Sequence, residues 1–287
     1  MYGNVIVSLA VILMLELLPS APLAAGLGAW WTLCLTAGVT AAYVLLVRVV
    51  FLWWQRRRAP ILEAETFHIF HSSLMQRFIV GGGILYGLIL YWLGWKGACG
   101  RFALGNSDAL AGVLGISPFL FVLVGIWAAC FPGSRVSGAG LASHLWTQAR
   151  LYLPVLIPWF AILSILDLMG LVAPGLERKI QEDALWGVGT FGALLLLLAW
   201  TFPALVIRLW RCPPLPPGVV REYLEDFFQR HGFRYRGIFL WNLLQGSIST
   251  AGIMGVFPGS RYILITPSLL SLLDQEELEA VMAHEMG

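Results

Sequence analysis

The chain ends with the stretch Asp274-Gln-Glu-Glu-Leu-Glu-Ala-Val-Met-Ala-His-Glu-Met-Gly287. Asp274 is a good helix N-cap, and Glu277, three residues later, completes a capping box with it. Leu278 and Glu285, seven residues apart, fall on one face of a helix that starts here. The stretch therefore predicts a capped helix on which Glu285 points inward with the apolar residues.

The pair His284-Glu285 is the first half of an H-E-x-x-H pattern. In that pattern two histidines one helical turn apart bind one zinc ion, and the glutamate acts on the metal-bound water. His284 is accordingly a candidate metal ligand and Glu285 a candidate catalytic base. The second histidine would follow Gly287, so the pair by itself is a weak motif that depends on its context.

Composition places the chain in a membrane. It has 287 residues, of which 59% are hydrophobic and 12% charged, whereas soluble domains have about 25% charged residues. The net charge of +2 gives no reason to expect nucleic acid as a partner. The cysteines form no C-x-x-C pair, so we expect structural roles for all of them: Cys34, Cys99, Cys130 and Cys212.

Six apolar windows are long enough, or nearly so, to cross a bilayer. They are residues 4–25, 30–54, 78–95, 109–131, 151–173 and 184–209. Arginines gather in the second, fourth and sixth connections, which favours a cytoplasmic location for those connections. The sequence thus predicts an integral protein of the inner or plasma membrane, with residues 1–211 in the bilayer and everything after residue 211 on the cytoplasmic side.

A proline-rich segment, 212–218, is predicted to be a semi-rigid linker between the membrane region and a small α+β domain, 219–287. Within the domain, Gly232 is expected to end a first helix, and Thr266 to cap a short helix that begins at Pro267. The expected elements are a helix over 219–231, strands over 235–241, 248–256 and 261–266, a short helix over 267–273, and the final helix.

This order of elements, with R-Y-I-L-I-T followed by E-E-L-E-A-V-M-A-H-E-M-G, resembles the M48 family of membrane zinc metalloproteases. The resemblance covers about residues 219–287 and is specific from residue 261 onward. The matching positions are Arg261 to Thr266, Leu269, Leu270, Glu276, Glu277, Ala280, Val281, Ala283, His284, Glu285 and Gly287.

The resemblance implies the N-terminal part of a zincin-like (gluzincin) protease domain that cleaves membrane-associated or misfolded proteins. His284 would be the first ligand of one Zn²⁺ and Glu285 the catalytic base. The second histidine and a glutamate ligand from a later helix are not in this sequence, so we expect the 287-residue chain alone to bind zinc poorly and to be inactive. Thr250-Ala251 stands where the family has an Asn-Ala pair on the strand that aligns substrate.

Two alternatives remain open at this point. The first is a sensor-transducer protease of the M56 (BlaR/MecR) kind, which has a similar topology but usually lacks the R-Y-I-L-I-T match and the glycine at position 287. The second is a non-catalytic polytopic scaffold or transporter in which the terminal His-Glu pair is a coincidence. The oligomeric state is not predicted by the sequence.

Overall fold

A computed structural model describes residues 2–19, 28–57, 64–102, 107–131, 140–241 and 249–286. The chain divides into two compact units, Met1–Pro174 and Gly175–Gly287. This division lies before the last long apolar helix, whereas the sequence led us to expect the boundary at the linker 212–218. The helix that leads into the C-terminal domain thus belongs to the same unit as that domain.

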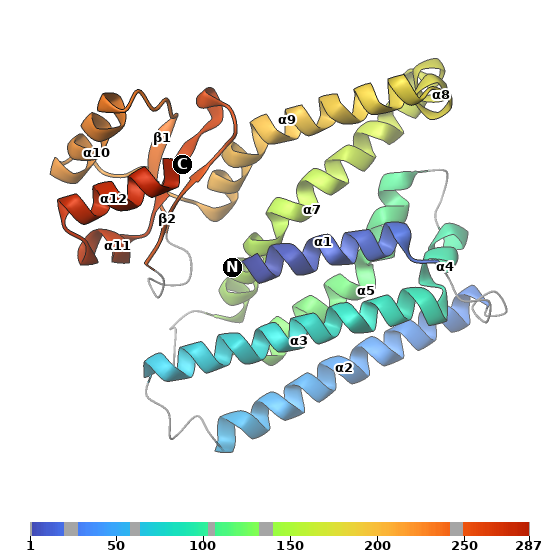
Figure 1. The fold of residues 1–287 in the computed structure, drawn as a ribbon. Helices are drawn as coiled ribbons and strands as arrows, with labels where there is room; N and C mark the ends of the chain where they lie inside the picture. The colour runs from blue at the N-terminus through green and yellow to red at the C-terminus, as the bar shows by residue number, and fades with distance from the viewer. Residues whose placement is uncertain are drawn as a thin grey trace. The chain divides into compact units, whose positions relative to one another are not determined.

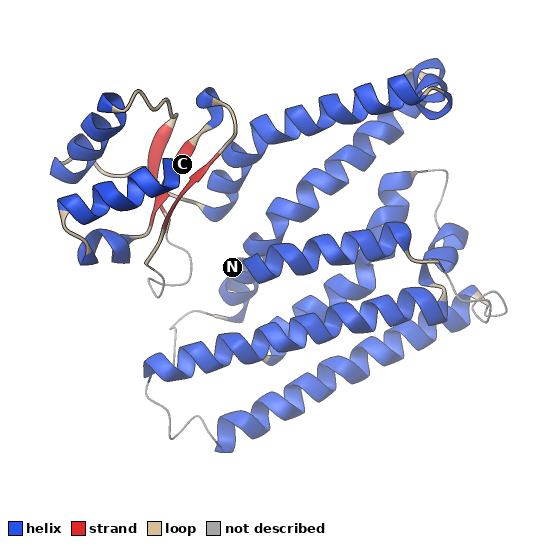
Figure 2. Ribbon diagram, viewed as in Figure 1, coloured by secondary structure: helices blue, strands red, loops and turns tan. Residues whose placement is uncertain are grey.

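The first unit is entirely helical in its described residues (Figures 1 and 2). Helix α5 lies at its centre and packs against both α2 and α7, while α1 packs along α3. The helices are α1 (Tyr2–Leu17), α2 (Ala29–Arg57), α3 (Ala64–Leu93), α4 (Trp95–Phe102), α5 (Asp108–Ala129) and α7 (Leu141–Val172).

Each of the six apolar windows overlaps one helix, the last being α9 (Ala184–Trp210). Five helical stretches are long and apolar enough to cross a membrane, and α1 contributes a shorter apolar stretch, Ile6–Leu17. With 16 residues, α1 is about 24 Å long, less than the hydrocarbon thickness of about 30 Å. The expected polytopic α-helical architecture is confirmed, with five helices of spanning length and apolarity among the described residues.

Two ionisable side chains within the apolar helices bond to the ends of α5. The carboxylate of Asp167 on α7 accepts hydrogen bonds from Ser107 Oγ at 2.6 Å and from the backbone N–H groups of Asp108 and Ala109 at 2.8 and 3.0 Å. At the other end, Arg48 on α2 donates to the carbonyl of Ala129 at 2.7 Å. Both satisfy backbone groups that a helix terminus leaves without intrahelical partners.

The second unit contains a three-stranded sheet of order β1-β3-β2. β1 (Gly237–Leu240) runs parallel to the central β3 (Tyr262–Ile265), and β2 (Ala251–Met254) runs antiparallel to it. All three strands are shorter than predicted. Part of the predicted second strand, at residue 248, lies outside the described residues.

Alternation along β3 gives the sheet two apolar faces, and both are covered. Ile263 and Ile265 face a core formed with α10 (Val219–Arg230), α11 (Pro267–Leu272) and α12 (Gln275–Met286). Tyr262 and Leu264 face the last turns of α9. Because β3 is buried on both faces, all four of its residues are apolar, as expected for a central strand.

The proline-rich segment is bonded to the sheet and is not a spacer, contrary to our expectation. Leu215 N–H donates to the carbonyl of Ile238 at 2.9 Å, and Leu240 N–H donates to that of Pro213 at 2.8 Å. Pro214 forms an antiparallel bridge with Phe239. Prolines lack a backbone donor and are tolerated at a sheet edge, so this segment covers the outer edge of β1.

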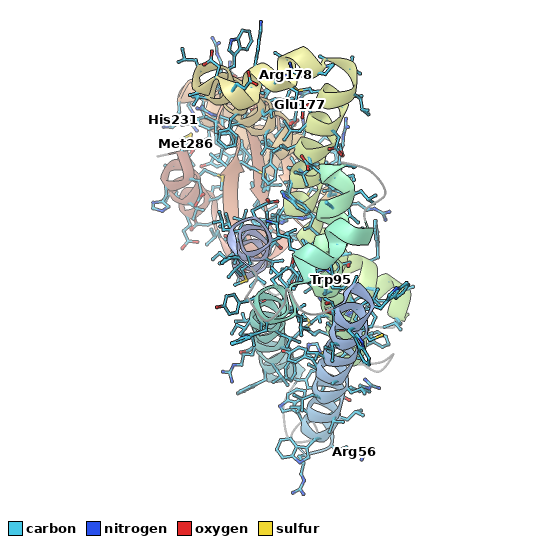
Figure 3. The ribbon with its side chains drawn as sticks, turned by 90° about the vertical axis from the view of Figure 1, so that its right-hand side faces the viewer. Arg56, Trp95, Glu177, Arg178, His231 and Met286 are labelled. Atoms are coloured by element: carbon cyan, nitrogen blue, oxygen red, sulfur yellow. The ribbon has the colours of Figure 1, made fainter. Side chains whose placement is uncertain are left out.

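The charged helix α8 (Pro174–Glu182) precedes α9 and carries Glu177 and Arg178, labelled in Figure 3. Lys179 Nζ lies 5.8 Å from the ring centre of Trp186 in the first turn of α9. Amphipathic lysine and tryptophan side chains are typical of the membrane–water interface. These side chains suit a position at the membrane–water interface where α8 meets α9.

Candidate active site at the end of α12

Helix α12 starts as the sequence predicts. Asp274 N–H donates to Glu277 Oε2 at 3.1 Å, and Glu277 N–H donates to Asp274 Oδ1 at 2.9 Å. Leu278 and Met282 are buried in the core of the C-terminal unit. The capping box and the apolar face of this helix are therefore confirmed.

Glu285 is exposed, and the prediction that it points inward was wrong. It lies in the last turn of α12, about one turn beyond the buried Met282. His284 is exposed as well. Both candidate site residues thus lie at an accessible helix end, and neither is part of the core.

The carboxylate of Glu285 lies beside strand β2. A Cβ placed on Gly252 would be 4.0 Å from Glu285 Oε2, and α12 packs against β2. Only β3 pairs with β2 among the described strands, so the other edge of β2 presents backbone groups that can pair with an added strand. Sequence reasoning missed Gly252, although a glycine within a predicted strand often marks a close approach.

Thr250 and Ala251, the predicted substrate-edge pair, lie at the start of β2. Thr266 Oγ1 donates to the carbonyl of Thr250 at 3.0 Å and accepts from Thr250 N–H at 2.9 Å. Thr266 occupies the N-cap position of α11, but its hydroxyl makes no capping bond. The expected side-chain cap is thus replaced by a tie between β3 and β2, which fixes the start of the edge strand.

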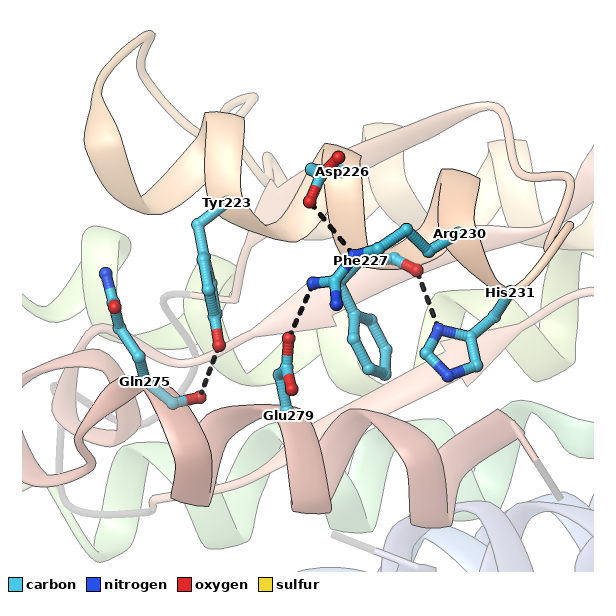
Figure 4. Close-up of polar contacts among 7 residues, drawn as sticks. All are labelled: Tyr223, Asp226, Phe227, Arg230, His231, Gln275 and Glu279. Carbon is cyan, nitrogen blue, oxygen red and sulfur yellow. Dashed lines mark hydrogen bonds and ion pairs between the residues drawn. The ribbon is translucent and has the colours of Figure 1, made fainter.

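A polar cluster joins α10 to α12 (Figure 4). Arg230 forms ion pairs with Asp226 at 3.0 Å and with Glu279 at 2.8 Å, and Tyr223 donates to the carbonyl of Gln275 at 3.2 Å. Hydrogen bonds from Tyr223 and then Arg230 lower the pKa of Glu279 below its usual value. The cluster thus connects α10 to the helix that carries His284.

A complete zinc site is not present in the part of the chain that the structure describes. No three His, Cys, Asp or Glu side chains there come together as a metal-binding group. A catalytic zinc needs three protein ligands and an open position. His284 can supply one imidazole nitrogen and Glu285 one carboxylate, so these residues do not form the whole donor set.

A surface cavity of about 730 Å³ lies elsewhere in the C-terminal unit. It is bordered by the end of α10 and the residues after it, including Phe233 and Arg234, and by Pro258 and Gly259. Neither His284 nor Glu285 lines it. The candidate site is therefore an open helix end beside a strand edge rather than this cavity.

These features define a polytopic membrane protein with a small α+β unit that places an exposed His-Glu pair beside a strand edge. Residues 214–287 match the model of peptidase family M48. The match confirms that this C-terminal segment resembles peptidase family M48, and it does not favour the sensor-transducer alternative.

Two further comparisons cover the membrane region as well. The chain is 25% identical over 245 residues to a CAAX prenyl protease 1 homolog from Oryza sativa subsp. japonica, which covers 82% of this chain and 56% of the relative. It also matches the crystal structure of S. mikatae Ste24p with a TM-score of 0.50 and 18% identity, over 89% of this chain and 65% of that one. The chain thus spans about half the length of the Oryza sativa relative and shares the fold of S. mikatae Ste24p.

Proposed function

We propose that this chain is the membrane region and the first part of the catalytic unit of a zinc-dependent endopeptidase. Its substrates would be membrane-associated or misfolded proteins, and its domain of residues 219–287 would lie on the cytoplasmic side. The observation that carries the proposal is the position of Glu285 on α12, with its carboxylate beside Gly252 of the edge strand β2. The M48 match of residues 214–287 supports it.

The free edge of β2 offers a way to hold a substrate. An extended peptide can pair with an exposed strand through backbone hydrogen bonds, independently of its sequence. A peptide paired with β2 would pass close to Glu285, because that carboxylate lies next to the strand. The tie from Thr266 to Thr250 keeps this edge in register with β3.

In such enzymes a bound zinc ion polarises the scissile carbonyl and activates water. His284 would bind the ion through one imidazole nitrogen, and the other ligands would come from residues that the structure does not describe. Glu285 would accept a proton at its carboxylate. Its exposure at the end of α12 leaves it free to reach a substrate backbone on β2.

The test compares His284→Ala and Glu285→Gln variants of the full-length protein in lipid nanodiscs. We expect stoichiometric zinc and chelator-sensitive cleavage of casein in the unaltered protein. His284→Ala should lose both zinc and activity, whereas Glu285→Gln should keep zinc and lose at least about 100-fold in rate, the usual effect of removing a general base.

Glu276→Gln serves as the control, since Glu276 is exposed on the first turn of the same helix. It should retain both zinc and activity. Full activity in Glu285→Gln, or unchanged zinc content in His284→Ala, would contradict the proposed roles of the two residues.

A further inference from the structure

The sheet of the C-terminal unit is packed directly on the end of a membrane-spanning helix. Ile207 of α9 is buried against Tyr262 and Leu264 of β3. Trp210, the last residue of α9, stacks on Trp241, which follows β1, with ring centres 5.6 Å apart and planes at 9°. The carboxyl ends of β1 and β3 are therefore level with the end of α9.

The opposite end of the sheet extends back along α9. There the turn between β2 and β3, Gly255–Arg261, contains a short 3₁₀ helix, Pro258–Ser260 (η4), that contacts α9. Figure 1 shows this turn beside α9, farther from the end of the helix than the strands are. The turn thus lies level with earlier residues of the span than Trp210.

The lipid-facing part of α9 reaches the level of this turn. Apolar side chains are exposed along one stretch of the helix: Leu185, Trp186, Val188, Phe191, Leu195, Leu196, Leu197 and Trp200. After this stretch, Pro203, Val206 and Ile207 are buried. A hydrocarbon core of about 30 Å takes about 20 helical residues, which from Ala184 extends to the region just before Ile207.

The turn has the chemistry of a segment that enters the membrane interface. Gly255–Ser260 contains no charged residue, and at its tip Val256 is 67% and Phe257 37% exposed. Turns exposed to water are usually built from polar residues with Gly and Pro. Two exposed large apolar residues side by side are instead typical of interfacial segments.

Basic residues flank the apolar tip. The guanidinium of Arg261 donates to the carbonyl of Val256 at 3.4 Å and lies 5.0 Å from the ring centre of Phe233. Arg236 is joined to Arg261 through a backbone hydrogen bond of 2.7 Å. The apolar tip is suited to contact the acyl chains of a leaflet, and the arginines behind it are suited to contact the phosphates of anionic lipids.

We propose that the β2–β3 turn inserts Val256 and Phe257 into the bilayer surface beside α9, with Arg261 and Arg236 at the level of the lipid phosphates. The partner is the anionic leaflet from which α9 emerges. Together with α9, this second contact fixes the height and tilt of the sheet, so that the free edge of β2 is held close to the membrane surface.

The test measures the depth of a fluorescent label by its quenching with spin-labelled lipids. The exposed Cys34 is first replaced by serine in the full-length protein, because the other described cysteines are buried. An NBD label is then attached to Val256→Cys in nanodiscs that contain anionic lipid. Leu196→Cys on the lipid-facing side of α9 is the positive control, and the 68% exposed Leu272→Cys on α11 is the negative control.

We expect blue-shifted emission and quenching at position 256 several-fold greater than at position 272, and close to that at position 196. Phe257→Cys provides a second position in case the first variant does not elute as a monodisperse protein. Arg261→Gln should weaken the quenching at position 256 in anionic nanodiscs. Labels at 256 and 257 that are as exposed to water as the label at 272 would overturn the proposal, as would a label at 196 that the lipids do not quench.

Discussion

Single residues decide the shape of the two segments that border the edge strand. Thr266 uses its hydroxyl to hold the start of β2 and leaves the N-terminus of α11 without a side-chain cap. Gly255 at the other end of β2 has φ of 123°, and a Cβ there would meet the carbonyl group of Ser260. One hydroxyl and one missing side chain thus set both ends of the strand proposed to bind substrate.

Replacement of Gly255 by alanine should destabilise the turn, because an L-residue at this φ is strained and its methyl group has no room. We expect a loss of about 1–3 kcal/mol, seen as a lower apparent Tm of the protein in nanodiscs. Gly259→Ala, in the same turn, is the matched control, since a Cβ there would have no atom within 4 Å. An equal effect of both changes would show that the turn does not depend on the Gly255 conformation.

At the scale of elements, α12 is held at its start, at its middle and on its buried face. Its capping box fixes the start of the helix, and the ion pair of Glu279 with Arg230 ties its middle to α10. Leu278 and Met282 anchor the opposite face in the core. The direction in which His284 and Glu285 project is therefore set by three independent contacts.

The tie between α10 and α12 should depend on pH. The pKa of Glu279 is lowered from 4.5 in the folded protein, first by Tyr223 and then by Arg230. A lowered folded-state pKa gives a stabilisation that is present above pH 4.5 and lost as pH falls through the folded-state value. The protein should accordingly lose apparent thermal stability in this acidic range.

Glu279→Gln should lower the apparent Tm at neutral pH. It should also remove the loss of Tm caused by protonation of Glu279, so that the Tm values of the variant and the unaltered protein become equal at low pH. Glu276→Gln, one turn earlier, is the control and should change little. Parallel pH profiles for Glu279→Gln and the unaltered protein would contradict a stabilising role of the Glu279 carboxylate.

At the scale of the molecule, α9 leads from the membrane region into the domain of residues 219–287 and forms one compact unit with it. The sheet packs on its last turns, and the proline-rich segment continues into an edge contact with β1. A helix that carries the sheet as part of one compact unit transmits its own tilt to the sheet. The membrane span is thus a structural part of the candidate catalytic unit.

If α9 crosses the bilayer, α8 and the domain that follows α9 (residues 219–287) lie on opposite sides of it. Gly175→Cys on α8 and Leu272→Cys on α11, both in the Cys34→Ser background, should react with a membrane-impermeant maleimide from opposite sides of sealed vesicles. We expect Leu272→Cys to be labelled from the cytoplasmic side, as the arginine distribution predicts. Labelling of both positions from one side would exclude the span.

The sequence by itself determined the features that depend on neighbouring residues. Apolar windows predicted the helices of the membrane region, and the Asp274–Glu277 spacing predicted the cap of α12. Gly232, with φ of 61°, ends α10 as expected. These features follow from local periodicity and backbone preferences, which can be read within a few residues of the chain.

Only the tertiary structure decided the contacts between distant segments. It brought Glu285 beside Gly252, tied Thr266 to Thr250, and paired the segment around Pro214 with β1. It also left Glu285 exposed, although its spacing from Leu278 placed it on the apolar face. Helical spacing determines the direction of a side chain, but its burial depends on how closely other elements enclose that turn, and this is decided by the packing of the whole unit.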